Sequence, residues 1–88
     1  MSDKHSKKKI KVERVQLGVR MEKRLVKVMK AMAEYHDMTL GDLMEGIILH
    51  SMEGNSPFGE DTIQRINQFK EIYGMDYDST AAHNFIEE

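Results

Sequence analysis

The chain has 88 residues, no cysteine and a net charge of −2. Its length indicates one small domain, and the lack of cysteine excludes disulfide bonds, thiolate metal sites and a cysteine nucleophile. The lysine-rich N-terminus lacks the apolar stretch of a secretory signal, and no apolar run approaches the ~18 residues that cross a membrane. We therefore expect a cytoplasmic protein without a membrane contact.

The charge is unevenly distributed along the chain. Residues 1–30 hold 11 of the 13 lysines and arginines against three acids, whereas residues 31–88 hold two against 12 acids. The first part therefore carries a net charge of +8 and the second −10. A protein polarised in this way can present a basic face to a polyanion while its acidic part stays away from it.

Residues 1–11, MSDKHSKKKIK, contain five lysines and one strongly apolar residue, Ile10. Such a segment cannot bury enough apolar surface to offset the entropy cost of ordering it. We therefore predict a flexible basic arm. The arm either contacts phosphates or simply keeps the chain soluble.

Residues 14–20 alternate apolar and polar side chains, and this period of two is typical of a half-buried strand. The apolar face is formed by Val15, Leu17 and Val19, and the opposite face by Arg14, Gln16, Gly18 and Arg20. No other stretch of the chain has this pattern. The sequence therefore predicts a single strand.

Two amphipathic helices are predicted after the strand. Apolar residues recur every three or four positions over 22–35, and again after Thr39. Thr39, with Asp42 three positions later, resembles the capping box that begins a helix. Between the helices, His36 and Asp37 are polar residues that tolerate a left-handed turn.

Residues 54–88 form an acidic C-terminal extension with more apolar residues than a linker would hold. A third helix is predicted over 60–73 with Gly74 as its stop, and a short last helix after Asp78 or Ser79. The extension either packs back on the core or binds another protein.

A single strand needs a partner, because alone it leaves backbone donors and acceptors without sheet partners. The simplest partner is the same strand of a second copy, and two-fold symmetry makes that pairing antiparallel. We therefore expect a homodimer whose apolar strand faces pack onto the helices. The expected dimer core consists of Val15, Leu17, Val19, Leu25, Val28, Met29, Met32, Leu40, Leu43, Met44, Ile47 and Ile48.

A two-stranded ribbon fits the DNA major groove, and arginine and glutamine are suited to the edges of guanine and adenine. The stretch VQLGVRMEKRLVKVMKAMAEYHDMTLGDLMEGI lies within residues 14–52, which resemble the ribbon-helix-helix family of the Arc/MetJ/CopG type. The resemblance implies a mainly α fold with one β-strand and an intertwined homodimer joined by an antiparallel ribbon. The implied divisions are the arm at 1–11, the ribbon-helix-helix domain at 12–53 and the helical extension at 54–88.

The resemblance also implies the site residues. The base-reading positions fall on Gln16, Gly18 and Arg20, where Gly18 departs from the family pattern because it has no side chain. The implied phosphate contacts are Thr39, Leu40 and Gly41 at the start of the second helix, where the helix dipole favours an anion, together with the basic residues Lys9, Lys11, Arg14, Lys23 and Arg24.

These expectations describe a dimeric, sequence-specific DNA-binding protein, most simply a transcriptional repressor, with a dimer of dimers on DNA as a further option. Two alternatives stay open. The chain could be an antitoxin whose residues 54–88 bind a toxin, or a dimerisation module that binds only protein. The sequence has no catalytic constellation, metal-ligand spacing or cofactor motif, so we expect neither an enzyme nor a cofactor.

Overall fold

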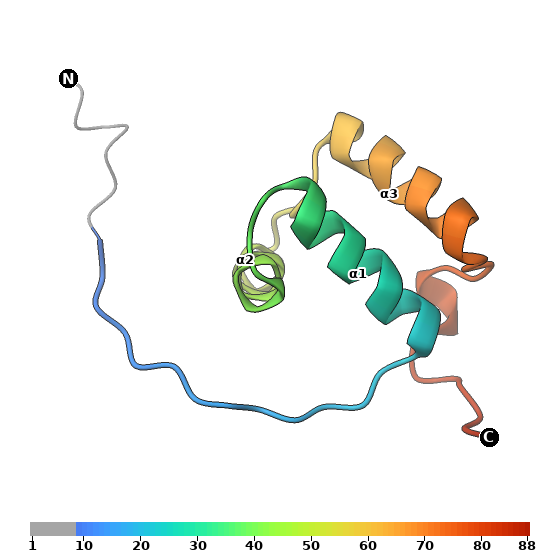
Figure 1. The fold of residues 1–88 in the computed structure, drawn as a ribbon, viewed down its shortest axis with the longest axis horizontal. Helices are drawn as coiled ribbons and strands as arrows, with labels where there is room; N and C mark the ends of the chain where they lie inside the picture. Colours follow the sequence, from blue (N-terminus) through green and yellow to red (C-terminus); the bar gives the residue numbers. More distant parts are fainter. Residues whose placement is uncertain (1–8) are drawn as a thin grey trace.

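The computed structural model describes residues 9–88 as an extended segment followed by three α-helices and one short 3-10 helix. The helices are α1 (Lys23–Tyr35), α2 (Leu40–Met52), α3 (Glu60–Tyr73) and the 3-10 helix η2 (Ser79–Ala81). Residues 9–22 form an extended trace that leads into α1, and the C-terminal residues return to the beginning of α1 (Figure 1). Among residues 9–88, no helix is long and apolar enough to cross a bilayer.

The three predicted α-helices are confirmed, and each predicted start or end lies within one residue of the observed one. Thr39 is the N-cap of α2, and its hydroxyl oxygen accepts a hydrogen bond of 3.0 Å from the backbone N–H of Asp42. Asp37 adopts a left-handed conformation with φ 58° between α1 and α2. Gly74, with φ 68°, ends α3 in the left-handed region that favours glycine. The short last helix is the 3-10 turn η2.

The predicted strand is wrong, and with it the predicted ribbon-helix-helix fold class. Residues 14–20 are extended but form no strand, and residues 9–88 contain no β-sheet. A strand is defined by backbone hydrogen bonds to a second strand, and no other segment of the described chain is available to pair with this one. The alternation of side chains predicted a strand, but it could not provide the pairing that a strand needs.

The core lies where α1 meets α2 and α3. Its buried side chains are Val28, Met32, Ala33 and Leu43, and the half-buried residues packed against them are Leu40, Ile47, Ile66, Phe69 and Met75. α3 lies along α1, while α2 crosses them and is seen nearly end-on in Figure 1. The C-terminal extension therefore contributes to the same core as α1 and α2.

The predicted flexible arm falls largely outside the residues that the structure describes. Of residues 1–11, the structure describes 9–11, which are extended and exposed. Lys9 and Lys11 belong to this described part.

Candidate nucleic-acid interface

The extended segment displays the predicted base-reading residues on its surface. All residues from 9 to 21 are exposed, including Gln16, Gly18 and Arg20. A Cβ built on Gly18 would meet no heavy atom within 4 Å. This part of the backbone is therefore exposed, and its hydrogen-bonding side chains are the amide of Gln16 and the guanidinium of Arg20.

The apolar side of the same segment is uncovered as well. Val15 is 82% exposed, Leu17 77% and Val19 59%. These values are far above those of Val28, Met32 and Leu43, which are at most 7% exposed. Apolar and polar residues of this segment are therefore exposed alike within the single chain.

The predicted dimer-core residues divide into three groups by burial. Val28, Met32 and Leu43 are buried within the single chain; Leu25, Met29, Leu40, Met44 and Ile47 are half-buried; Val15, Leu17, Val19 and Ile48 are exposed. Ala33 is also buried, although the sequence reading did not select it. Its small side chain gave no strong apolar signal.

Arg14 joins the extended segment to α2. Its Nε donates to Oε2 of Glu45 at 3.0 Å, and its Nη2 donates to Oε1 at 2.9 Å. This two-pronged hydrogen bond lowers the pKa of Glu45. Arg14, predicted as a phosphate contact, is therefore held by a carboxylate of its own chain.

Glu22 organises the beginning of α1. Its carboxylate accepts hydrogen bonds from the backbone N–H of Arg24 at 3.1 Å and of Leu25 at 3.0 Å. The Tyr77 hydroxyl donates to the same carboxylate at 2.6 Å. The Tyr77 hydrogen bond is the largest influence on the pKa of Glu22 and, with the two amides, lowers it to about 2 despite partial desolvation. Burial, followed by this hydrogen bond, raises the pKa of Tyr77 to about 12.

Arg24 contacts the residue that caps α1 and residues that follow α3. Its Nε donates to Glu22, while its Nη1 donates to Oδ1 of Asp76 and to the carbonyl oxygen of Gly74, both at 3.0 Å. Its guanidinium carbon lies 5.5 Å from the centre of the Tyr77 ring. The sequence reading assigned Arg24 to DNA phosphate and missed this cluster, because Tyr77 and Glu22 are 55 positions apart.

Two further basic side chains of this region lie close to residues 73–88. Arg20 forms an ion pair with Glu87. The Nζ of Lys27 lies 6.0 Å from the centre of the Tyr73 ring. Lys23, at the first position of α1, is exposed. The candidate interface therefore combines exposed cations with cations that already have an acidic or aromatic neighbour.

The beginning of α2 has the local form of a helix N-terminus. Leu40 and Gly41 are its first residues behind the cap Thr39, and a Cβ on Gly41 would meet no heavy atom within 4 Å. Asp42 adds a negative charge in the same turn. A helix N-terminus attracts anions in general, so this site alone does not identify a ligand.

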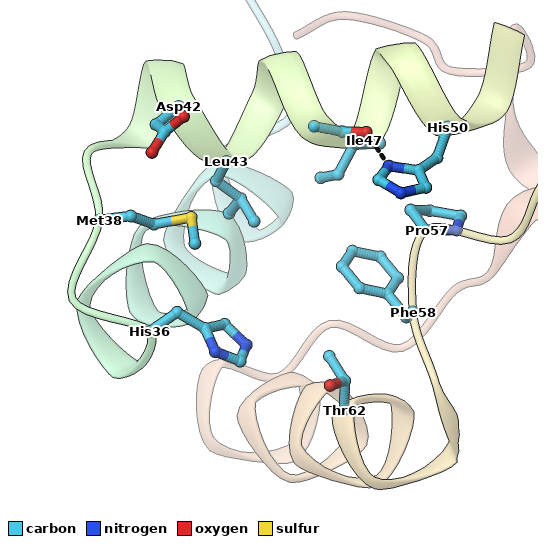
Figure 2. A pocket seen from close by; sticks show the side chains of 10 residues that line it. His36, Met38, Asp42, Leu43, Ile47, His50, Pro57, Phe58 and Thr62 are labelled. Atoms are coloured by element: carbon cyan, nitrogen blue, oxygen red, sulfur yellow. Dashed lines mark hydrogen bonds between the residues drawn. The ribbon is translucent and has the colours of Figure 1, made fainter. Parts of the chain in front are cut away.

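An open hollow of about 330 Å³ lies between α2 and the segment that leads into α3 (Figure 2). Leu43, Ile47 and Phe58 point into it, and the rings of His36 and His50 stand on its wall. The Nδ1 of His50 lies 2.7 Å from the carbonyl oxygen of Gly46. Because a carbonyl can only accept, this nitrogen carries the proton. The described residues contain no cluster of three groups that could hold a metal ion.

Comparisons of the chain with protein-family models, with curated proteins and with solved structures found no match. No family is therefore shown for this chain. The DNA-binding function implied by the sequence resemblance stays a prediction.

Proposed function

We propose that this protein binds double-stranded DNA as a homodimer and acts as a cytoplasmic transcriptional regulator, in the simplest case a repressor. The observation that carries the proposal is the extended segment 9–21, which is exposed along its whole length and presents Gln16 and Arg20 as well as two lysines, Lys9 and Lys11. Glutamine and arginine side chains are well suited to base edges, and lysines to phosphates. The sequence resemblance of residues 14–52 to DNA-binding regulators supports the same function.

Charge distribution supports a polyanionic ligand. Residues 1–30 hold 11 of the 13 lysines and arginines, and four of them, Lys9, Lys11, Arg14 and Arg20, lie on the described extended segment. Lys9, Lys11 and Lys23 are exposed. Such a surface increases both the affinity for DNA and the rate of association at low salt.

The uncovered apolar side chains support a homodimer. Val15, Leu17 and Val19 line one side of the extended segment, and Leu49 and Met52 on α2 are 61% and 77% exposed. Groups of exposed large apolar residues are typical of protein interfaces. A second copy would cover them and bring two segments with Gln16 and Arg20 into one complex.

The proposal is tested by selecting bound duplexes from a random DNA pool and measuring their affinity for variants of the full chain. Arg20→Gln is expected to cost about 1–3 kcal/mol on a selected duplex and to relax base preference at one position. Arg65→Gln is the matched control. Arg65 lies on α3, and its guanidinium carbon is 4.5 Å from the centre of the Tyr35 ring of α1. If the selection enriches no sequence and binding is weak at every salt concentration, the proposal is wrong.

The C-terminal extension, residues 54–88, favours a second candidate function, the binding of a partner protein such as a toxin. Ile72, Phe85 and Ile86 are 68%, 52% and 93% exposed. The packing of α3 on α1 limits such a partner to the outer side of α3 and to the last residues. Hydrogen exchange separates the two functions, because a toxin-binding segment gains protection only when its partner is added.

A further inference from the structure

The C-terminal segment 73–88 lies against Arg20 and Arg24, two basic residues that the sequence predicts to contact DNA. Asp76 and Glu87 contact Arg24 and Arg20, respectively. Tyr73 lies close to Lys27. In Figure 1 this segment passes beside the beginning of α1, where the extended segment enters the helix.

The contacts of Arg24 use three of the five N–H donors of its guanidinium group. Nε is taken by Glu22, and Nη1 is shared between the carboxylate of Asp76 and the carbonyl of Gly74. The Tyr77 ring lies near the guanidinium carbon. A DNA phosphate could form a two-pronged contact with Nη1 and Nη2 together only by displacing Asp76 or Gly74 from Nη1.

Arg20 is in a comparable position, although its neighbour is more exposed. Its side chain is 85% exposed and that of Glu87 68% exposed. Ion pairs with this exposure contribute little stability and exchange readily. The carboxylate of Glu87 therefore occupies the place of an anionic ligand without binding Arg20 permanently.

We propose that residues 73–88 act as an intramolecular competitor of DNA: the carboxylates of Asp76 and Glu87 hold Arg24 and Arg20, and DNA must displace them to bind. This inference rests on the proposed DNA-binding function and adds a regulatory step to the same surface. Its chemical basis is that a carboxylate and a phosphate are recognised by the same guanidinium group.

Contacts that do not depend on the two competing carboxylates keep these close to their arginines. The Tyr77 hydroxyl donates to Glu22 at 2.6 Å, and the rings of Tyr77 and Phe85 meet edge to face with their centres 5.1 Å apart. Because these contacts do not involve Asp76 or Glu87, they can persist when the two ion pairs break. The segment would then stay anchored while its charges are displaced.

The test uses the full chain with the double substitution Asp76→Asn and Glu87→Gln. The control carries Glu53→Gln and Glu71→Gln, which removes the same charge from two acids that form no ion pair among residues 9–88. Affinity for a selected duplex is measured by fluorescence anisotropy at one salt concentration. We expect the first variant to bind about two- to tenfold more tightly than the control, the range set by two exposed ion pairs.

A double-mutant cycle assigns the effect to the arginine. If Glu87 competes through Arg20, Glu87→Gln tightens binding in the natural chain but not in an Arg20→Gln background. Glu87 is exposed near the end of the chain, so its substitution leaves the packing of α1 and α3 in place. Circular dichroism on each variant checks the helix content.

The outcomes separate the competitor from the DNA-binding function. If the natural chain binds a selected duplex and the Asp76/Glu87 variant binds no more tightly than the control, residues 73–88 do not compete with DNA, and the proposed DNA binding stands. Weaker binding by that variant also overturns the competitor, because the segment would then position Arg20 and Arg24 for DNA. If none of the chains binds DNA, the proposed function is wrong, and the competitor is overturned with it.

Discussion

Gly18 lies in the middle of the extended segment, two positions away from both Gln16 and Arg20. Its surroundings are open, since an added Cβ would meet no heavy atom within 4 Å. Its φ is not in the left-handed region that only glycine adopts easily. The structure therefore places no steric demand for glycine at this position within one chain.

Gly18→Asn is expected to change the folded state by at most about 0.5 kcal/mol, because an exposed position without neighbours tolerates substitution. If the segment contacts bases, the new amide adds a donor and an acceptor and changes the base preference of the selected duplexes. A general loss of affinity would mean that a close approach of DNA to the backbone requires glycine. An unaltered affinity and base preference would show that this face does not meet DNA.

The Glu22–Tyr77 hydrogen bond predicts how stability depends on pH. The pKa of Glu22 is about 2 in the folded chain and has an ordinary value of 4.5. A lowered pKa in the folded state means that the unfolded state binds more protons in this range. The ionised Glu22 carboxylate therefore stabilises the folded chain fully above pH 4.5, and this contribution is lost as the pH falls from about 4.5 to about 2.

Tyr77→Phe removes the hydrogen bond that contributes most to this shift. We expect a lower thermal midpoint at neutral pH, and a smaller further decrease on acidification to pH ~3 than in the natural chain. Tyr73→Phe is the matched control, because its hydroxyl forms no hydrogen bond with a described residue. Equal acid sensitivity of the natural chain and Tyr77→Phe, measured by circular dichroism, would contradict the assigned role of Tyr77.

At the scale of elements, each helix has a local start or stop signal that the sequence states directly. Thr39 begins α2, and Gly74 ends α3. Both act on backbone groups within a few positions, so their effect can be read without knowing the fold. The apolar period of three and four similarly indicates which side of each helix meets the core.

Thr39→Ala is expected to destabilise the chain by about 0.5–2 kcal/mol, because the N–H of Asp42 loses its hydrogen-bond acceptor. Thr39→Ser keeps the hydroxyl and should retain most of the stability. Chemical denaturation of the two variants measures the difference. Equal stability of the alanine and serine variants would show that the cap contributes nothing.

The elements that could not be predicted depend on partners far away in sequence. The alternation of residues 14–20 predicted the extended backbone, but strand pairing requires a second strand that the described chain does not contain. The contacts of Asp76 and Tyr77 with the start of α1 were also missed, because no local pattern links them to Glu22 or Arg24. Of the predicted site residues, Gln16 and Gly18 are exposed, whereas Arg14, Arg20 and Arg24 each form an ion pair with a carboxylate of the same chain.

At the scale of the whole molecule, the packed core is small. Within residues 9–88, four apolar residues are buried, all on α1 and α2. Short chains bury a modest fraction of their surface, and many depend on association for stability. The exposed apolar residues of the extended segment and of α2 therefore suggest that the chain gains part of its stability from a second copy.

Self-association predicts a thermal midpoint that rises with protein concentration, since a dimer is stabilised by mass action. Leu17→Asp places a charge on the uncovered apolar side of the extended segment and is expected to weaken the dimer and remove this dependence. Because Leu17 is 77% exposed in one chain, the substitution should leave the helices of that chain intact. Sedimentation equilibrium at micromolar concentrations and circular dichroism measure the two effects.

Gln16→Asp is the matched control for this experiment. It introduces the same charge one position away, on the opposite face of the segment, which the proposed function assigns to DNA and not to the second copy. A dimer that tolerates Asp at residue 16 but not at residue 17 would show that the apolar face is the one buried on association. If both variants dimerise as the natural chain does, the segment lies outside the dimer interface. The exposed residues Leu49 and Met52 of α2 would then be the next candidates to carry it.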